Sequence, residues 1–188
     1  MAQLPDLLVL RHGETEWNRV GRMQGTLDSP LTDTGRRQAA RQGQILQDFN
    51  VDGWDWVSSP QGRAMATAQI ASGRADVATD ARLAEIDVGD WTGVTKEQIL
   101  AQRPDATARG PLAWYDFAPG GEHISGLARR VEAFLADVSG PTVVVTHGIT
   151  SRVIRCLATG QSPSNYANVS GGQGVVYHVS GGQTRLLE

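Results

Sequence analysis

Two histidines that lie far apart in the chain occupy nearly the same local setting. His12 follows Arg11 at the end of an apolar run and precedes Gly13. His147 ends a second apolar run and precedes Gly148. A neutral imidazole is a nucleophile that can take a phosphoryl group, and a protonated imidazole donates to negatively charged oxygens. Because a glycine lets the main chain approach a ligand closely, the pattern predicts an anion-binding site.

Two further residues complete a set that can transfer a phosphoryl group. Arg63, like Arg11, carries a planar fork of donors that matches phosphate oxygens. Glu85 can protonate a leaving oxygen and later deprotonate a water. Phosphoryl transfer depends mainly on positioning and charge stabilisation, which these groups supply. Each residue also has an ordinary structural interpretation, as a surface arginine, a turn carboxylate or a hydrogen-bonded histidine.

The elements that must position these residues alternate between strand and helix. Strands are predicted over 6–10, 54–59, 76–83 and 142–146, and a terminal hairpin over 173–188. Helices are predicted over 31–49, 61–72, 95–103, 123–138 and 149–159. This order is typical of an α/β fold, a three-layer sandwich whose mainly parallel central sheet carries helices on both faces. We find no repeat or linker, so residues 1–188 are expected to form a single domain.

Helix starts can be read from capping residues. Thr32 or Asp33 is the expected cap of the helix over 31–49. Ser59 followed by Pro60 predicts the start of the next helix, as a cap and a first-turn proline. Thr95 has glutamine three residues later, which is the spacing of a capping box.

The fold class brings the candidate residues together. Ligands of parallel sheets bind outside the carboxyl ends of the strands. His12 and His147 each follow a strand, and Arg63 lies on the first turn of the helix that follows 54–59. We therefore expect all three side chains to converge at one edge of the sheet.

Composition excludes several partners. The chain has 188 residues and a net charge of -3, which gives no basic face for nucleic acid. No stretch is apolar and long enough for a signal peptide or a membrane span. The one cysteine, Cys156, cannot form an internal disulfide, so a buried helix position and a cytoplasmic location are expected. The oligomeric state has no signal in the sequence.

Motifs for metal-dependent chemistry are missing from the sequence. It contains no Walker loop, no paired acidic motif for magnesium and no closely spaced His and Cys set for zinc. A route through phosphohistidine, with no metal and no cofactor, is consistent with this pattern.

Five ordered blocks of the sequence resemble the histidine phosphatase superfamily, in its phosphoglycerate-mutase-like branch. They are LLVLRHGETEWNRVGRMQGTLDSPLTDTGRRQA, SSPQGRAMATAQ, LAEIDVGDWTGV, PGGEHISGLARRVEAFL and VVVTHG. The resemblance covers nearly the whole chain and is weakest over 98–118. It implies an α/β sandwich and a phosphatase that acts on a small phosphomonoester. Sugar phosphates, phosphoglycerate derivatives and α-ribazole phosphate are candidate substrates from relatives.

The resemblance also implies a role for each matched residue. His12 would be the phosphorylated nucleophile and Glu85 the proton donor to the leaving group. The remaining phosphate pocket would consist of Arg11, Arg63, His147 and the main chain of Gly148. Asn18 and Gln24 match polar positions that face the substrate or the phosphate in relatives.

Departures from the family's mutases favour hydrolysis over isomerisation. Val88 stands where mutases carry a tyrosine, Ile149 where they carry asparagine, and the arginine pair before the proline-rich loop is missing. Lys96 does match a mutase lysine, so a cofactor-dependent phosphoglycerate mutase stays the alternative. A non-catalytic module that binds phosphorylated ligands is a second alternative. The aromatic residues of the variable segment either line a substrate pocket or pack that segment: Trp114, Tyr115 and Phe117.

Overall fold

The structure is a computed structural model that describes residues 4–108, 110 and 112–188. The described residues form a six-stranded sheet in the order β3-β2-β4-β1-β5-β6. The strands are β1 (Leu7–Arg11), β2 (Asp55–Ser58), β3 (Ala78–Thr79), β4 (Thr142–Thr146), β5 (Val176–Ser180) and β6 (Gln183–Leu187). Neighbours among β3, β2, β4 and β1 are parallel, whereas β5 is antiparallel to both β1 and β6. The predicted mainly parallel sheet and terminal hairpin are confirmed.

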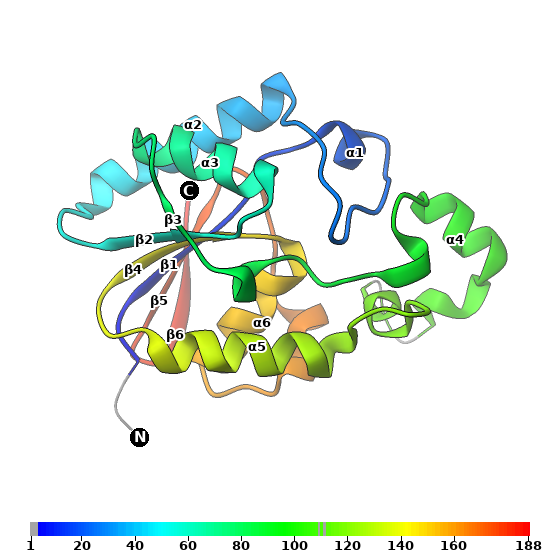
Figure 1. Ribbon diagram of the computed structural model, residues 1–188. Coiled ribbons are helices and arrows are strands. Elements are labelled where there is room, and N and C mark those ends of the chain that lie inside the picture. Colours follow the sequence, from blue (N-terminus) through cyan, green and yellow to red (C-terminus); the bar gives the residue numbers. More distant parts are fainter. Residues whose placement is uncertain (1–3, 109, 111) are drawn as a thin grey trace.

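Helices cover both faces of this sheet, as expected for a three-layer sandwich (Figure 1). On one face lie α2 (Asp33–Phe49) and α3 (Gly62–Ser72), and on the other α5 (His123–Asp137) and α6 (Gly148–Ala158). The short helices α1 (Glu16–Arg19) and α4 (Lys96–Gln102) lie to one side of these layers. Short 3-10 turns complete the described elements: Ala81–Leu83, Gly89–Trp91, Pro104–Thr107, Ala113–Phe117 and Pro163–Asn168.

Alternating side chains of the central strands supply two apolar layers. Leu8 and Leu10 of β1 pack with Leu46 of α2 on one face of the sheet. Leu7 and Val9 belong to the opposite layer, which α5 and α6 cover. Because both faces of β1 and β4 are buried, their sequences are continuously apolar rather than alternating. Each fully buried leucine or valine contributes about 1.5–3 kcal/mol, and this rigid centre fixes where β1 and β4 end.

The helix starts confirm two predictions and correct a third. Thr32 caps α2, and Thr95 forms the expected capping box at α4. The predicted start at Ser59 and Pro60 is wrong, because α3 begins at Gly62. The Ser59 hydroxyl instead lies 2.7 Å from His147 Nε2.

A carboxylate from a distant loop replaces the expected cap of α3. The side chain of Asp28 accepts a hydrogen bond from the Arg63 N–H at 3.2 Å. The predicted strand over 76–83 is also shorter than expected. It pairs only at Ala78–Thr79 within the described residues, because Asp80 then caps a 3-10 turn by accepting from the Arg82 N–H at 2.8 Å.

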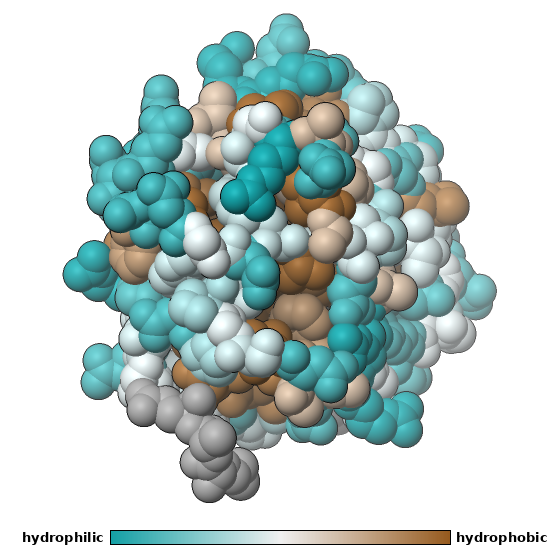
Figure 2. Space-filling view, turned by 60° about the vertical axis from the view of Figure 1, so that its left-hand side comes forward, coloured by the Kyte–Doolittle hydropathy of each residue, from teal (hydrophilic) through white to brown (hydrophobic). Residues whose placement is uncertain are grey.

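Hydrophilic and intermediate residues cover most of the side of the molecule that Figure 2 brings forward, and hydrophobic residues show among them in separate places. Within residues 4–108, 110 and 112–188, no helix is long and apolar enough to cross a membrane.

Two glycines fix the distance between the loop after β1 and the start of α2. A Cβ on Gly13 would lie 2.2 Å from the carbonyl oxygen of Gly35. A Cβ on Gly35 would lie 2.0 Å from the carbonyl oxygen of Glu14. Both neighbours are backbone atoms, so neither clash can be relieved by a side-chain rotation. The pair of glycines therefore holds the residues after His12 against α2.

We predict that Gly35→Ala destabilises the protein by about 2 kcal/mol or more, although alanine is the better helix former. The added methyl group must push the main chain apart, and overpacking outweighs the gain of about 1 kcal/mol in helix propensity. Urea unfolding measures the change. Gly140→Ala is the matched control, because no described atom lies within 4 Å of a Cβ there. Equal stability of the two variants would contradict the prediction.

Candidate active site

His12 lies directly after β1 and is buried. Its Nδ1 is 2.7 Å from the carbonyl oxygen of Gly13, and since a carbonyl only accepts, the proton is assigned to Nδ1. The Nε2 lone pair is then available for attack on an electrophile. Burial lowers the pKa of His12 well below its usual value, and the charges of Arg11 and Arg63 lower it further. His12 is therefore held as the neutral, nucleophilic imidazole.

His147 comes directly after β4, as the residue before α6. Its ring centroid is 5.2 Å from that of His12. Nε2 is hydrogen-bonded to Ser59, whereas Nδ1 is buried without a partner in the described part of the chain. Burial, followed by the charge of Arg63, lowers the pKa of His147 well below its usual value.

Arg63 is fully buried at the first turn of α3, and its donors can be counted. Nη1 donates to the carbonyl of Leu27 at 2.6 Å and to Asp28 Oδ1 at 2.9 Å. Nη2 donates to the carbonyl of Gly25 at 3.1 Å. Nε finds no partner among the described residues. Arg63 Nε–H is therefore a buried donor that is left for an oxyanion.

Arg11 and Gly148 meet at the ends of β1 and β4. Arg11 Nε is buried and is also unpartnered within the described chain. A Cβ at Gly148 would lie 3.4 Å from Cζ and Nε of Arg11 and 3.6 Å from Glu85 Oε2. Glycine at this position therefore leaves room between a guanidinium and a carboxylate.

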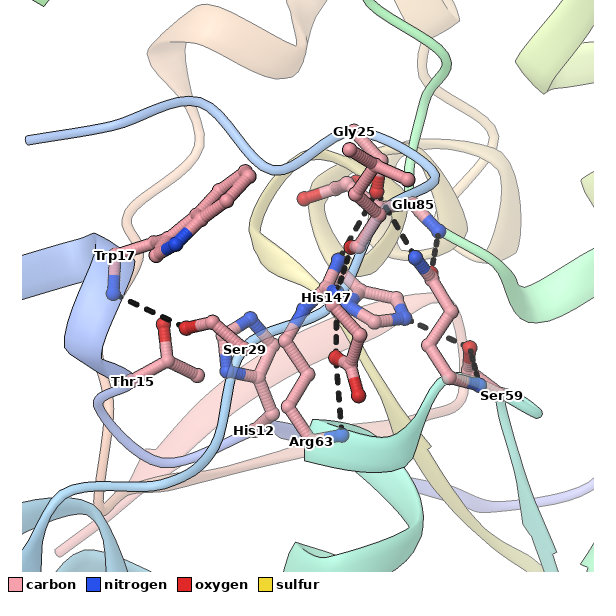
Figure 3. Close-up of polar contacts among 12 residues, drawn as sticks. His12, Thr15, Trp17, Gly25, Ser29, Ser59, Arg63, Glu85 and His147 are labelled. Atoms are coloured by element: carbon pink, nitrogen blue, oxygen red, sulfur yellow. Dashed lines mark hydrogen bonds and ion pairs between the residues drawn. The ribbon is translucent and has the colours of Figure 1, made fainter. Parts of the chain in front are cut away.

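Glu85 lies at the N-terminus of α6. Its Oε1 accepts from the N–H groups of Ile86 and Thr150, both at 3.1 Å, and from the Thr150 hydroxyl at 3.0 Å. Oε2 accepts from the Ile149 N–H at 3.2 Å. These hydrogen bonds hold the Glu85 side chain against the first turn of α6. Figure 3 shows Glu85, His147, His12 and Arg63 around a common space, although they come from separate segments.

Asn18 and Gln24 also lie at this site. Asn18 Oδ1 accepts from the Thr15 N–H and from Gln173, both at 3.3 Å. Gln24 is buried, with its Oε1 unpaired in the part of the chain that the structure describes. The cavity between these residues has a volume of about 60 Å³, enough for a few water molecules or one phosphoryl group. Its lining residues are Arg11, His12, Asn18, Arg22, Met23, Gln24, Gly25, Arg63, Glu85 and Tyr115.

Several residues that hold this arrangement were missed by sequence reasoning. Gln61 donates to the carbonyl of Gly25 at 2.9 Å and accepts from the Glu85 N–H at 2.8 Å. Gln173 donates to the carbonyl of His12 at 3.1 Å. Ser59, Gln61 and Asp28 lie in matched blocks and could have been found there. Gln173 lies outside these blocks and reaches the site through tertiary packing alone.

The three aromatic residues of the variable segment have different positions. Tyr115 lines the cavity, and desolvation raises its pKa to about 12. Trp114 is buried against Trp91 and Tyr115, with the Lys96 ammonium 5.4 Å from its ring centroid. Phe117 is exposed. One of the three therefore borders the site, and Trp114 packs the segment.

No group of three or more His, Cys, Asp or Glu side chains that could hold a metal ion occurs within the residues described. The positive charges around the cavity come from arginine.

The comparisons with known proteins agree with this geometry. The histidine phosphatase superfamily (branch 1) pattern matches residues 7–186. An acid phosphatase of Mycobacterium tuberculosis is 36% identical over 153 residues, which cover 79% of this chain and 72% of that protein. Phosphoserine phosphatase 1 of Hydrogenobacter thermophilus is 33% identical over 172 residues, which cover 85% of this chain and 79% of that protein.

A solved structure shows the same relationship in three dimensions. Mycobacterial glucosyl-3-phosphoglycerate phosphatase, in complex with VO3, is 32% identical and superposes with a TM-score of 0.79. The match covers 98% of this chain and 97% of that one. The family expected from the five sequence blocks is thereby confirmed. The chain belongs to branch 1 of the histidine phosphatase superfamily.

Proposed function

We propose that this protein is a phosphatase that hydrolyses a small phosphomonoester through a covalent phosphohistidine at His12. The observation that carries the proposal is a set of buried nitrogens that lack partners in the described chain. Arg11 Nε and Arg63 Nε belong to residues that line the cavity, and His147 Nδ1 belongs to a ring whose centroid is 5.2 Å from that of His12. A buried donor left unpaired costs about 1–3 kcal/mol. A bound phosphoryl group supplies the missing acceptors.

The first half of the reaction forms the phosphoenzyme. His12 Nε2 attacks phosphorus in line, the bond to the leaving oxygen breaks, and Glu85 gives that oxygen a proton. An arriving dianion beside Glu85 disfavours its ionised form, so substrate binding itself promotes the acid form. The same dianion favours protonation of His147, which then donates from Nδ1 to the transferring group.

The second half regenerates the enzyme. Glu85, now a carboxylate, takes a proton from a water that attacks the phosphorus. The His12–phosphorus bond breaks and inorganic phosphate leaves. His12 returns to the neutral form that its burial favours.

Three residues favour hydrolysis over the mutase alternative. Val88 and Ile149, which replace mutase polar groups, are buried in the core. Lys96 lies over Trp114, and the cavity lining does not include it. The described residues thus offer little to retain a released bisphosphate. Water is then the acceptor of the phosphoryl group.

We also propose that residues 1–188 act as one catalytic domain without a metal ion or other cofactor. The family match over 7–186 and the single sheet support one domain. The single cysteine, buried and unpaired, supports a cytoplasmic location. Phosphate release from a panel of metabolite phosphates, with and without a chelator, tests the metal-free scheme, and loss of activity in the chelator would contradict it.

His12→Ala is expected to abolish covalent labelling, because no other nucleophile takes the place of its Nε2. The measurement is a quenched-flow reaction with a radiolabelled phosphomonoester, stopped in alkali to preserve phosphohistidine. His123→Ala, at the exposed start of α5, serves as the control and keeps labelling. If the His12→Ala variant were labelled at the level of the parent protein, His12 would not be the nucleophile. If the parent protein bound phosphate but released none from the substrate, the alternative of a non-catalytic binding module would be supported.

Glu85→Gln is expected to slow alkyl phosphates by about 10²- to 10⁴-fold, the usual contribution of a general acid. The rate of the phosphorylation step falls much less for an activated aryl phosphate, because its phenolate leaves without a proton. Single-turnover rates for the two substrates give the comparison. Equal losses for both would mean that Glu85 is not the acid.

The stability of the ligand-free protein is expected to fall as the pH drops below about 6.5, the unfolded pKa of histidine. The unfolded chain then binds protons at His12 and His147, whereas the folded protein resists them because burial lowers both pKa values. Each histidine contributes up to about 1.4 kcal/mol per pH unit. Urea unfolding between about pH 5.5 and 7.5, about one unit on either side of that pKa, is expected to show a shallower dependence of stability on pH for His147→Gln than for His123→Gln. Identical slopes would contradict the neutral assignment of His147.

A further inference from the structure

A tyrosine hydroxyl borders the cavity in addition to the charged and amide side chains already described. It belongs to Tyr115, in the 3-10 turn Ala113–Phe117. The cavity has a volume of about 60 Å³, so a phosphoryl group that fills it lies close to all of its walls. The Tyr115 side chain is therefore within reach of the oxygens that a bound phosphoryl group gains and loses.

The segment that carries Tyr115 is fixed on both sides of this residue. The Tyr166 hydroxyl donates to the carbonyl of Leu112 at 2.8 Å. The carboxylate of Asp116 accepts from the Ile124 N–H at 2.8 Å, at the start of α5. Tyr115 thus has a defined position at the cavity before a ligand binds.

The hydroxyl of Tyr115 forms no hydrogen bond with the residues that the structure describes. Burial, together with the charge of Glu85, raises the pKa of Tyr115 to about 12, and the charges of Arg11 and Arg152 lower the pKa by less. The hydroxyl therefore keeps its proton at neutral pH. It is a neutral group that can both donate and accept a hydrogen bond through one oxygen atom.

The proposed reaction leaves one oxygen with a single protein partner. In an in-line transfer, the oxygen that leaves lies opposite His12 Nε2, and in the scheme above only Glu85 acts on it. A second donor to that oxygen would stabilise the charge that develops there as the bond to phosphorus breaks. Tyr115 borders the same small cavity as Glu85 and senses its charge.

We propose that the Tyr115 hydroxyl is a further catalytic group, which binds the oxygen opposite His12 in both halves of the reaction. In the first half it donates a hydrogen bond to the leaving oxygen. The bond between His12 Nε2 and phosphorus forms, the bond from phosphorus to the leaving oxygen breaks, and that oxygen takes its proton from Glu85.

In the second half a water molecule occupies the place of the leaving oxygen. One O–H of this water donates to the Tyr115 oxygen, and Glu85 takes the other proton. The bond from water oxygen to phosphorus forms while the His12–phosphorus bond breaks. Tyr115 keeps its own proton throughout. This inference rests on the proposed phosphatase activity and adds a residue to its mechanism.

Tyr115→Phe removes the hydroxyl and keeps the ring. In single turnovers, we expect phosphorylation by phenyl phosphate to slow by about 10-fold, the effect of one hydrogen bond. The same step with p-nitrophenyl phosphate is expected to slow by less than about three-fold, because its better leaving group needs less stabilisation. Phosphate release from the preformed phosphoenzyme is expected to slow by about 10-fold after either substrate, since the intermediate is the same.

Tyr166→Phe is the matched control for the position of the segment. It also removes one tyrosine hydroxyl, and it breaks the hydrogen bond to the carbonyl of Leu112. Tyr166 is not among the described residues that line the cavity. We expect this variant to unfold at a lower temperature than the parent and to keep the parent's rates in both steps.

A fluorinated side chain separates donation from acceptance. 3-Fluorotyrosine in place of Tyr115 keeps the hydroxyl but makes it a stronger donor and a weaker acceptor. Phosphorylation by phenyl phosphate is expected to become faster and hydrolysis of the phosphoenzyme slower, each by about two-fold. Changes of both steps in the same direction would contradict the two roles.

The outcomes distinguish this inference from the proposed function. If the parent protein released phosphate from neither substrate, the phosphatase itself would be refuted, and the role of Tyr115 with it. If the parent turned over both substrates and Tyr115→Phe kept the parent's rates, only the role of Tyr115 would be refuted. Equal losses in Tyr115→Phe and Tyr166→Phe, or equal slowing of phosphorylation by the two substrates, would also overturn that role.

Discussion

The structure depends on keeping several polar nitrogens buried around a cavity without full hydrogen bonding. Arg63 shows how this is done, because protein acceptors hold Nη1 and Nη2 of its guanidinium and leave Nε unpaired within the described chain. The carbonyls of Gly25 and Leu27 and the carboxylate of Asp28 fix its position. A rotation that paired Nε with the protein would break these contacts. In the proposed function, this unpaired donor binds the phosphoryl group.

The same constraint sets the protonation of the imidazoles. Burial lowers the pKa of His12 and the pKa of His147 well below their usual values, and the charges of Arg11 and Arg63 lower both pKa values further. In the proposed mechanism, a bound phosphoryl dianion reverses this preference for His147 and turns the second histidine into a donor to the transferring group.

Sequence patterns predicted the parts of the fold that local chemistry determines. The apolar runs of β1 and β4 predicted two strands, each of which is followed by a histidine. Because the two strands are parallel neighbours, their carboxyl ends lie at the same edge of the sheet. Asn18 and Gln24 came from family resemblance alone, because polar loop residues carry no periodic signal. The contact of Asp28 with the start of α3 could not be predicted from local patterns, since Asp28 lies in a loop far earlier in the chain. Gln173 was missed because it too reaches the site through tertiary packing.

The central claim is that an oxyanion pairs with the buried nitrogens of His147 and Arg63. Nitrogen-15 NMR of labelled protein, titrated with orthovanadate, tests it directly. We expect His147 to gain a second ring N–H and the Arg63 Nε–H to shift downfield and become protected from exchange. Vanadate that binds while both resonances stay unchanged would contradict the account.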